Sequence, residues 1–246
     1  MSRVRAMPAP WAVLALLGFL AALMAAWHIL APARFLYGVW YEPVGIAANI
    51  AEYGPRNRHR QGFAGTSREE HERLMGELVT AINHHGKGLE QIQYHDRNGA
   101  PIASLLTEAE IVHLRDVARL VGYANQVALW AAILLAVSTF WLYRRGVPMP
   151  SLRLLLLGML ALVAAFAALV MLLGPVKVFY QLHVWLFPSG NQWFFYYEDS
   201  LMTTMLKAPV IFGPIAAAMV GLALLLWWLL FALIGYWFQK RDAARL

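Results

Sequence analysis

The sequence predicts an all-α membrane protein in which four transmembrane helices carry a small extracytoplasmic α/β cap. The 246-residue chain is 60% hydrophobic and only 14% charged, with a mean hydropathy of +0.53, which is too apolar for a soluble domain of this size. Four apolar runs reach the length, about 20 residues, that a helix needs to cross a hydrocarbon core. The alternating pattern of membrane barrel strands is absent, so we expect helices, which satisfy their own backbone hydrogen bonds in lipid.

The first apolar run has two interpretations. The four runs are Pro10–Ala31, Gln126–Tyr143, Leu152–Leu173 and Val210–Trp237. The first follows Arg3 and Arg5 and ends in the small residues of "LAPA", a pattern that a cleaved signal peptide also has. Its apolar stretch is longer than the usual core of a signal peptide, which favours an uncleaved signal-anchor helix.

Basic residues gather at the same ends of these spans and predict the orientation. They are Arg3, Arg5, Arg144, Arg145, Arg153, Lys240, Arg241 and Arg245. Because cytoplasmic segments of membrane proteins are enriched in Lys and Arg, we expect both termini in the cytoplasm and the cap outside. The net charge of +6 follows from this topology and predicts no nucleic-acid partner.

These features divide the chain into five segments. Residues 1–31 hold the cytoplasmic N-terminus and the first span, and residues 32–125 form the cap and lead into the second span. Residues 126–173 contain the second span, a cytoplasmic loop and the third span. Residues 174–209 form an aromatic extracytoplasmic segment, and residues 210–246 contain the fourth span and the cytoplasmic C-terminus.

Two patterns predict the structure of the cap. "SREEHERLMGELVTAINHH" places Leu74, Leu78 and Ile82 at steps of four, which predicts an amphipathic helix with Thr66 or Ser67 as its N-cap. The short alternating stretch "LEQIQYHD" favours a strand or hairpin.

The stretch "LTEAEIVHLRDVARL" begins a further helix. Thr107 is a good N-cap, and Glu110 three residues later completes a capping box. No proline follows before Pro148, so we expect one continuous helix from about Glu108 through Tyr143.

Glu110, His113 and Asp116 share one face of that helix because they are three residues apart. Acids beside an imidazole can fix its tautomer and raise its basicity, which makes His113 a candidate catalytic residue. The alternative is that Glu110 only caps the helix and that Asp116 pairs with a neighbouring arginine.

The outer segment after the third span is unusually aromatic. Nine aromatic residues fall between Phe179 and Tyr197, which is typical of an interfacial belt but also of a lipid pocket. We expect a substrate pocket formed by Tyr180, Trp185, Trp193, Phe194 and Tyr196.

His183 lies in this apolar surrounding and is the second candidate catalytic residue. It is either an interfacial histidine with a backbone partner or an acid/base group facing a cavity with His113. Asn191 belongs to the turn "PSGNQW", and its amide either forms the turn or donates to an oxyanion. Asp199 either orients a histidine or caps the chain before the last span.

The sequence lacks the residues that several classes of enzyme need. There is no cysteine, which excludes a catalytic thiol, a thiolate metal site and disulfides. No G-x-S-x-G elbow, phosphate loop or dinucleotide fingerprint occurs, and "HERLM" has Met75 where a zincin needs histidine.

Three segments occur in order within this four-span frame: "GTSREE", "LTEAEIVHLRDV" and "FYQLHVWLFPSGNQWFFYYEDSL". Together they resemble the lipoprotein intramolecular transacylase family of bacterial membrane proteins. The resemblance implies catalytic histidines at His113 and His183, with Glu110, Asp116, Asn191 and Asp199 in support. It implies an enzyme of the bacterial cell membrane that needs neither metal nor cofactor. Its partners would be membrane lipid and a diacylated lipoprotein, whose sn-2 acyl chain moves to the α-amino group of the lipidated cysteine.

Two alternatives remain on the sequence alone. His113, Asp116 and His183 are also possible ligands of a metal-dependent membrane hydrolase. The second alternative is that the chain is not an enzyme but a membrane scaffold whose cap binds a partner.

Overall fold

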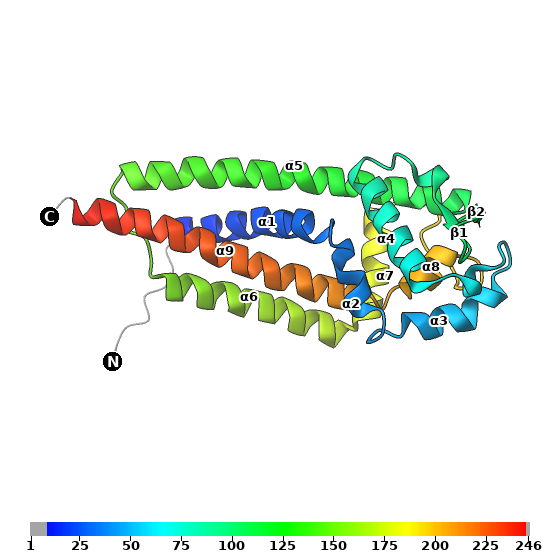
Figure 1. Ribbon diagram of the computed structural model, residues 1–246. Coiled ribbons are helices and arrows are strands. Elements are labelled where there is room, and N and C mark those ends of the chain that lie inside the picture. Colours follow the sequence, from blue (N-terminus) through cyan, green and yellow to red (C-terminus); the bar gives the residue numbers. More distant parts are fainter. Residues whose placement is uncertain (1–8, 245–246) are drawn as a thin grey trace. The chain divides into compact units, whose positions relative to one another are not determined.

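The computed structural model describes residues 9–244, which form two units and are mostly helical (Figure 1). One, the helical unit, comprises residues 9–27, 124–173 and 219–244. The other, the mixed unit, comprises residues 28–123 and 174–218 and includes one small sheet. The predicted basic residues Arg3, Arg5 and Arg245 lie outside the described residues.

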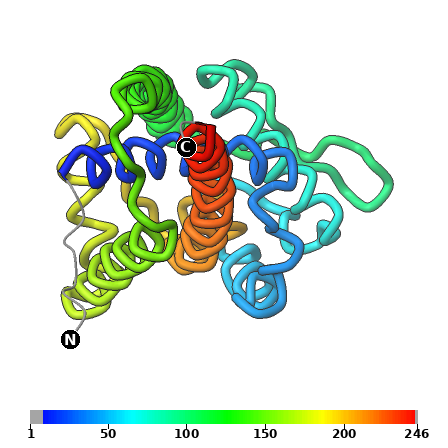
Figure 2. Tube along the Cα trace, turned by 90° about the vertical axis from the view of Figure 1, so that its left-hand side faces the viewer, coloured from blue at the N-terminus to red at the C-terminus, as the bar shows by residue number. Residues whose placement is uncertain are grey.

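Four helices in the described residues are long and apolar enough to cross a membrane, which confirms the predicted fold class. They are α1 (Ala9–Leu30), α5 (Glu108–Arg144), α6 (Leu152–Leu173) and α9 (Phe212–Ala243). Figure 2 views the helical unit towards the helix ends, where α5, α6 and α9 can be followed as separate coils. Helix α5 is continuous, as the absence of proline predicted, and it contributes to both units.

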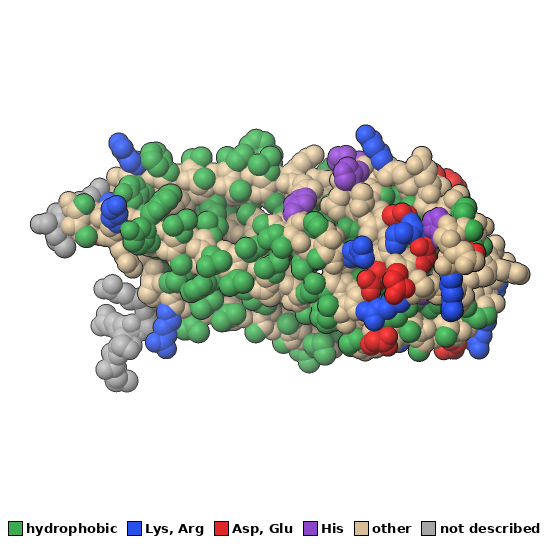
Figure 3. All heavy atoms as spheres, viewed as in Figure 1, with side chains coloured by type: hydrophobic (Ala, Val, Ile, Leu, Met, Phe, Trp, Pro, Cys, Tyr) green, Lys and Arg blue, Asp and Glu red, His purple; other side chains and the backbone are tan. Residues whose placement is uncertain are grey.

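Aromatic residues and one glycine pack the core of the helical unit. Trp227 and Phe231 of α9 are fully buried, and the indole N–H of Trp227 donates to the carbonyl of Ala15 at 2.8 Å. Gly18 of α1 allows this approach, because a Cβ there would stand 2.7 Å from the Phe231 ring. Other side chains of the long helices point outwards and are apolar, as Figure 3 shows on one face, including Trp130, Phe140 and Trp141 of α5.

The mixed unit contains the remaining regular elements. The short helices are α2 (Tyr37–Trp40), α3 (Ile46–Tyr53), α4 (Arg68–Asn83), α7 (Pro175–Leu186) and α8 (Leu201–Leu206), with 3₁₀ turns at Arg34–Leu36, Gly54–Arg56, Phe63–Gly65 and Leu89–Gln91. Strands β1 (Gln93–His95) and β2 (Pro101–Ser104) form the predicted hairpin, antiparallel with Gln93 opposite Ser104. Charged side chains on the face in Figure 3 gather over this unit.

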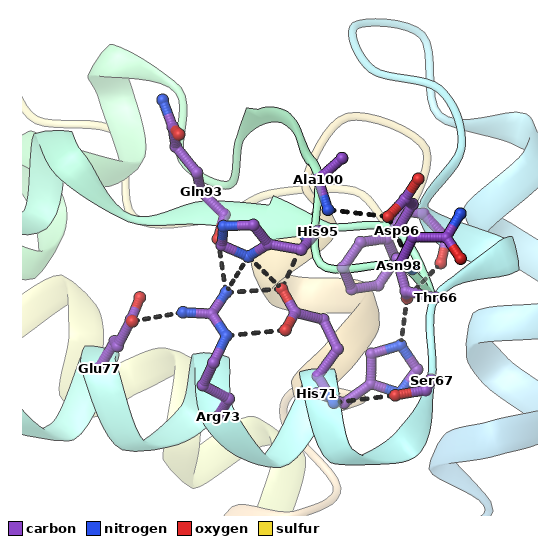
Figure 4. Close-up of polar contacts among 12 residues, drawn as sticks. Thr66, Ser67, His71, Arg73, Glu77, Gln93, His95, Asp96, Asn98 and Ala100 are labelled. Carbon is purple, nitrogen blue, oxygen red and sulfur yellow. Dashed lines mark hydrogen bonds and ion pairs between the residues drawn. The ribbon is translucent and has the colours of Figure 1, made fainter.

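Helix α4 follows the predicted pattern and is fixed to the hairpin. Ser67 is the N-cap and accepts from the amide of Glu70, while Leu74 and Leu78 are buried. Figure 4 shows Arg73 of α4 reaching β1, where its guanidinium donates to the carbonyl of Gln93 at 2.6 Å. The hairpin leads directly into α5, so α4 steadies the chain where the candidate site begins.

Candidate active site

His113 and His183, the two predicted catalytic residues, come together in the mixed unit. His113 lies on the second turn of α5 and His183 lies on α7. Their ring centroids are 6.0 Å apart and the rings are tilted by 33°. His113 is 8% exposed and His183 is half-buried, so the two imidazoles form a partly enclosed acid/base pair.

A backbone carbonyl determines the tautomer of His183. Nδ1 of His183 lies 2.8 Å from the carbonyl oxygen of Phe179, one helical turn earlier. A carbonyl only accepts, so Nδ1 carries the proton and Nε2 keeps its lone pair. Burial lowers the pKa of His183, and the bond to the Phe179 carbonyl opposes this in part. His183 is therefore a neutral base near pH 7, with Nε2 as its basic atom.

His113 has an unusual feature, a buried ring nitrogen without a partner. Nδ1 of His113 is inaccessible to solvent and makes no hydrogen bond within residues 9–244. Almost all buried polar atoms in native proteins are hydrogen-bonded, and exceptions often mark functional groups. This imidazole is thus not committed to a structural hydrogen bond through Nδ1.

The two acids that flank His113, Glu110 and Asp116, accept hydrogen bonds from residues other than His113. Glu110 is fully buried and accepts from the amide and hydroxyl of Thr107 at 2.6 and 2.7 Å, which completes the predicted capping box. Asp116 is 6% exposed and accepts from Nδ2 of Asn191 at 2.6 Å. Neither carboxylate bonds the imidazole of His113 in the described part of the chain.

The side chains of Asn191 and Asp199 have partners on other segments of the chain. The backbone of Asn191 forms the expected turn, with its amide 3.0 Å from the carbonyl of Pro188. Its side chain holds Asp116 and so connects this turn to α5. Asp199 pairs with Arg58 at 3.2 Å and with His59 at 3.5 Å, which places it beside neither candidate catalytic histidine.

Aromatic rings surround the two imidazoles. Phe179, Phe187 and Trp193 have ring centroids 4.1, 5.1 and 5.1 Å from His183. Phe187 also packs edge-on against His113 at 4.8 Å, and Phe195 lies 6.0 Å from it. We call Phe179, Phe187, Trp193 and Phe195 the aromatic cage.

The predicted pocket residues lie at different distances from the pair. Trp193 contacts His183, and Tyr180 and Phe194 pack against Trp193. The ring of Tyr196 packs against Phe194, and Trp185 is 72% exposed.

The sequence analysis missed Phe179 and Phe187, although they lie four residues before and after His183. That spacing on one helical face was the available signal. Phe195 had no comparable local signal.

An open hollow of about 610 Å³ lies along the other face of α7. Its walls are mostly apolar, and they include Val176, Lys177, Tyr180 and Val184. Tyr180 contributes to both this hollow and the rings beside His183. The hollow therefore offers an apolar surface next to the cage.

The ligand set of the alternative metal hydrolase does not assemble. Within residues 9–244, no three His, Asp or Glu side chains gather to hold a metal ion. Both oxygens of Asp116 already face donors, one from Asn191 and the other from Arg119.

Comparisons with known proteins show the family and the fold. The family model described as "Lipoprotein intramolecular transacylase Lit" matches residues 13–208. A solved structure of the membrane integral lipoprotein intramolecular transacylase Lit from Bacillus cereus, a point-substituted variant, shares the fold with a TM-score of 0.62 and 16% sequence identity. The match covers 96% of this chain and 93% of that one. No curated protein sequence matches. The matched segment contains both histidines and the whole cage, and the chain belongs to the lipoprotein intramolecular transacylase family of membrane acyltransferases.

Proposed function

We propose that this protein moves the sn-2 acyl chain of a diacylglyceryl-cysteine lipoprotein to the α-amino group of that cysteine. The product is a lyso-form lipoprotein. The observation that carries the proposal is the pair of imidazoles 6.0 Å apart, one with a lone pair on Nε2 and both packed against aromatic rings. The membership of the family supports the substrate class.

The first step is attack of the neutral amine on the ester carbonyl carbon. The new N–C bond leaves a proton on nitrogen, and Nε2 of His183 accepts it, because its Nδ1 is already protonated. Negative charge collects on the former carbonyl oxygen, where a ring N–H of His113, the second imidazole of the pair, stabilises it.

The second step is collapse of the tetrahedral intermediate. The bond from the acyl carbon to the glyceryl sn-2 oxygen breaks, and this oxygen takes a proton from the imidazole pair. The amine proton therefore ends on the new glyceryl hydroxyl, the ester becomes an amide, and both histidines return to their starting states. No external acyl acceptor or oxidant is needed.

A covalent acyl-enzyme is unnecessary, because donor ester and acceptor amine belong to one substrate molecule. Holding two such groups in a reactive geometry can lower a barrier by several kcal/mol. The cage supplies that enclosure, and the chain has no cysteine to act as a nucleophile. We assign the acyl chains to the apolar surfaces around Trp193, Phe194 and the hollow along α7.

Asp116 and Asn191 support the reaction by holding other residues in place. We propose that Asp116 and Asn191 hold the turn after α7 against α5, so that the cage keeps its place around both imidazoles. We further propose that both termini lie in the cytoplasm and that the mixed unit faces the outside of the bacterial cytoplasmic membrane. The lipidated N-terminus of a lipoprotein is presented on that side.

The reaction makes a sharp experiment possible, since transfer within one molecule leaves the substrate mass unchanged. A reporter diacylated lipoprotein is incubated with purified protein, and its N-terminal peptide is fragmented by mass spectrometry. We expect the acyl chain on the α-amino group at constant total mass with the wild type, and no change with His113→Ala or His183→Ala. Loss of one acyl chain would indicate a hydrolase and would overturn the proposal, as would full activity of both variants.

A further inference from the structure

Glu110 connects the beginnings of two helices through one buried carboxylate. Its Oε2 accepts from the amide and hydroxyl of Thr107, the residue before the first turn of α5. Its Oε1 accepts from the hydroxyl of Ser200 at 2.5 Å. Glu110 and Ser200 are both 0% exposed, so water does not replace either bond.

Ser200 is the N-cap of α8, and its hydroxyl both donates and accepts a hydrogen bond. Its oxygen accepts from the amide of Thr203 at 2.8 Å, while its O–H donates to Glu110. The first turns of α5 and α8 are thus joined, although Glu110 and Ser200 are 90 positions apart.

Helix α8 is a fixed support for this connection. The hydroxyl of Tyr37 donates to the carbonyl of Met205 at 3.0 Å, and Nδ2 of Asn49 donates to the carbonyl of Thr204 at 2.8 Å. Both bonds are buried and come from distant parts of the chain. The bond from Ser200 therefore ties Glu110 to α8, whose own position is fixed by these two bonds.

The position of Glu110 matters because His113 follows it by three residues on the same helical face. Phe195, which packs near His113, lies in the same short segment that ends at Ser200. A shift of Ser200 would change both the start of α5 and the wall of the cage.

We propose that Ser200 is a positioning residue for the acyl transfer, acting through Glu110 to hold His113 in place. This inference rests on the proposed function. Without the Ser200 donor, Oε1 of Glu110 would be a buried polar atom with an unmet hydrogen bond, which native structures avoid. The first turn of α5 would move to find a donor, and His113 would move with it.

The test compares Ser200→Cys and Ser200→Ala with a matched control. Cysteine keeps the shape of serine but is a weak donor, and alanine removes the hydroxyl. Ser67→Ala makes the same change at the N-cap of α4, far along the chain from both histidines. Each variant is purified in detergent, its thermal unfolding is recorded, and kcat and KM are measured with the reporter lipopeptide.

We expect kcat of both Ser200 variants to fall on the order of tenfold, from one buried hydrogen bond left unmade, with KM unchanged. In histidine-labelled protein, the NMR resonances of His113 should shift in these variants and not in Ser67→Ala. The inference fails if kcat of Ser200→Cys equals that of the wild type. It also fails if KM alone rises, or if Ser67→Ala loses as much activity. These outcomes leave the proposed function intact, whereas a wild type without transfer activity removes both.

Discussion

Asn191 donates a hydrogen bond from Nδ2 to the carboxylate of Asp116 at 2.6 Å, across 75 positions of the chain. Glu110 makes the corresponding connection to Ser200 on the other side of His113. The two acids that flank His113 in the sequence thus hold the segment from residue 191 to residue 200 against α5. Trp193 and Phe195, which lie between the two connections, pack beside the imidazoles.

Asn191→Ala should lower activity by removing the connection to Asp116. The lost bond is to a charged, buried acceptor, so we expect a fall in kcat/KM of about tenfold to a hundredfold. Gln192→Ala is the matched control, because the side chain of Gln192 is exposed and contacts only the nearby carbonyl of Phe194. Equal activity of the two variants would show that the connection has no part in the reaction.

The pH dependence should report His183. Burial lowers the pKa of this base below its ordinary value of 6.5. Since the neutral form accepts the proton, His183 should contribute a rise of kcat/KM with pH whose midpoint lies below 6.5. The attacking α-amine of the lipopeptide, with an ordinary pKa of about 7.7–8.0, adds a second rise, so its own pKa is titrated separately and its contribution is divided out. A remaining enzyme midpoint above 7 would contradict the assignment of His183 as the base.

Phe195→Ala should let water reach the pair. Phe195 is 9% exposed and packs near His113, and its truncation opens space in the cage. We expect some acyl chain to appear as free fatty acid, since water then competes with the amine. Phe63→Ala removes another buried phenyl ring of the mixed unit, outside the cage, and should destabilise the protein without producing fatty acid. Equal hydrolysis by both variants would argue against a role for the cage in excluding water.

His71 should make the mixed unit less stable in mild acid. Its Nδ1 lies 2.7 Å from the hydroxyl of Tyr41. Its Nε2 lies 2.7 Å from the hydroxyl of Thr66, as Figure 4 shows. Burial lowers the pKa of His71 to about 4, so the unfolded chain binds the extra proton between about pH 4 and 6.5. The stability is complete above 6.5 and is lost as the pH falls towards 4.

At pH 5.5 the loss from His71 should be on the order of 1 kcal/mol, because the unfolded chain is protonated about one pKa unit below its own value while the folded chain is not. Thermal unfolding followed by tryptophan fluorescence at pH 7.5 and 5.5 measures it. His71→Gln should be less stable at pH 7.5 but should lose less on acidification than the wild type. Identical pH dependence in both proteins would assign the acid sensitivity to other groups.

Local patterns predicted the helices well because their causes are local. The apolar runs, the Ser67 N-cap and the uninterrupted sequence from Glu108 each depend on neighbours within a few residues, and each is present. The last helix extends to Ala243. The apolar run that predicted it ends at Trp237, because the final turns of the helix are polar and hydropathy alone does not detect them.

The details of the candidate site depended on contacts that sequence spacing does not encode. The row of Glu110, His113 and Asp116 left open whether the acids orient the imidazole or pair locally, and the local partners Thr107 and Arg119 are both present. The further partners, Ser200 and Asn191, lie 75 or more positions away and could not be read from the spacing. Asp199 likewise pairs with Arg58, on a loop that no periodic pattern places nearby.

The most direct test of the central claim, transfer within one substrate molecule, is a crossover experiment. Two reporter lipopeptides of different peptide sequence are mixed, one carrying perdeuterated acyl chains and the other ordinary chains. After incubation with the protein, fragmentation locates and weighs the N-linked chain on each peptide. The account predicts that each peptide keeps its own isotopic chain on the α-amino group, at unchanged total mass, and that His183→Ala yields neither product. A deuterated chain on the unlabelled peptide would contradict it.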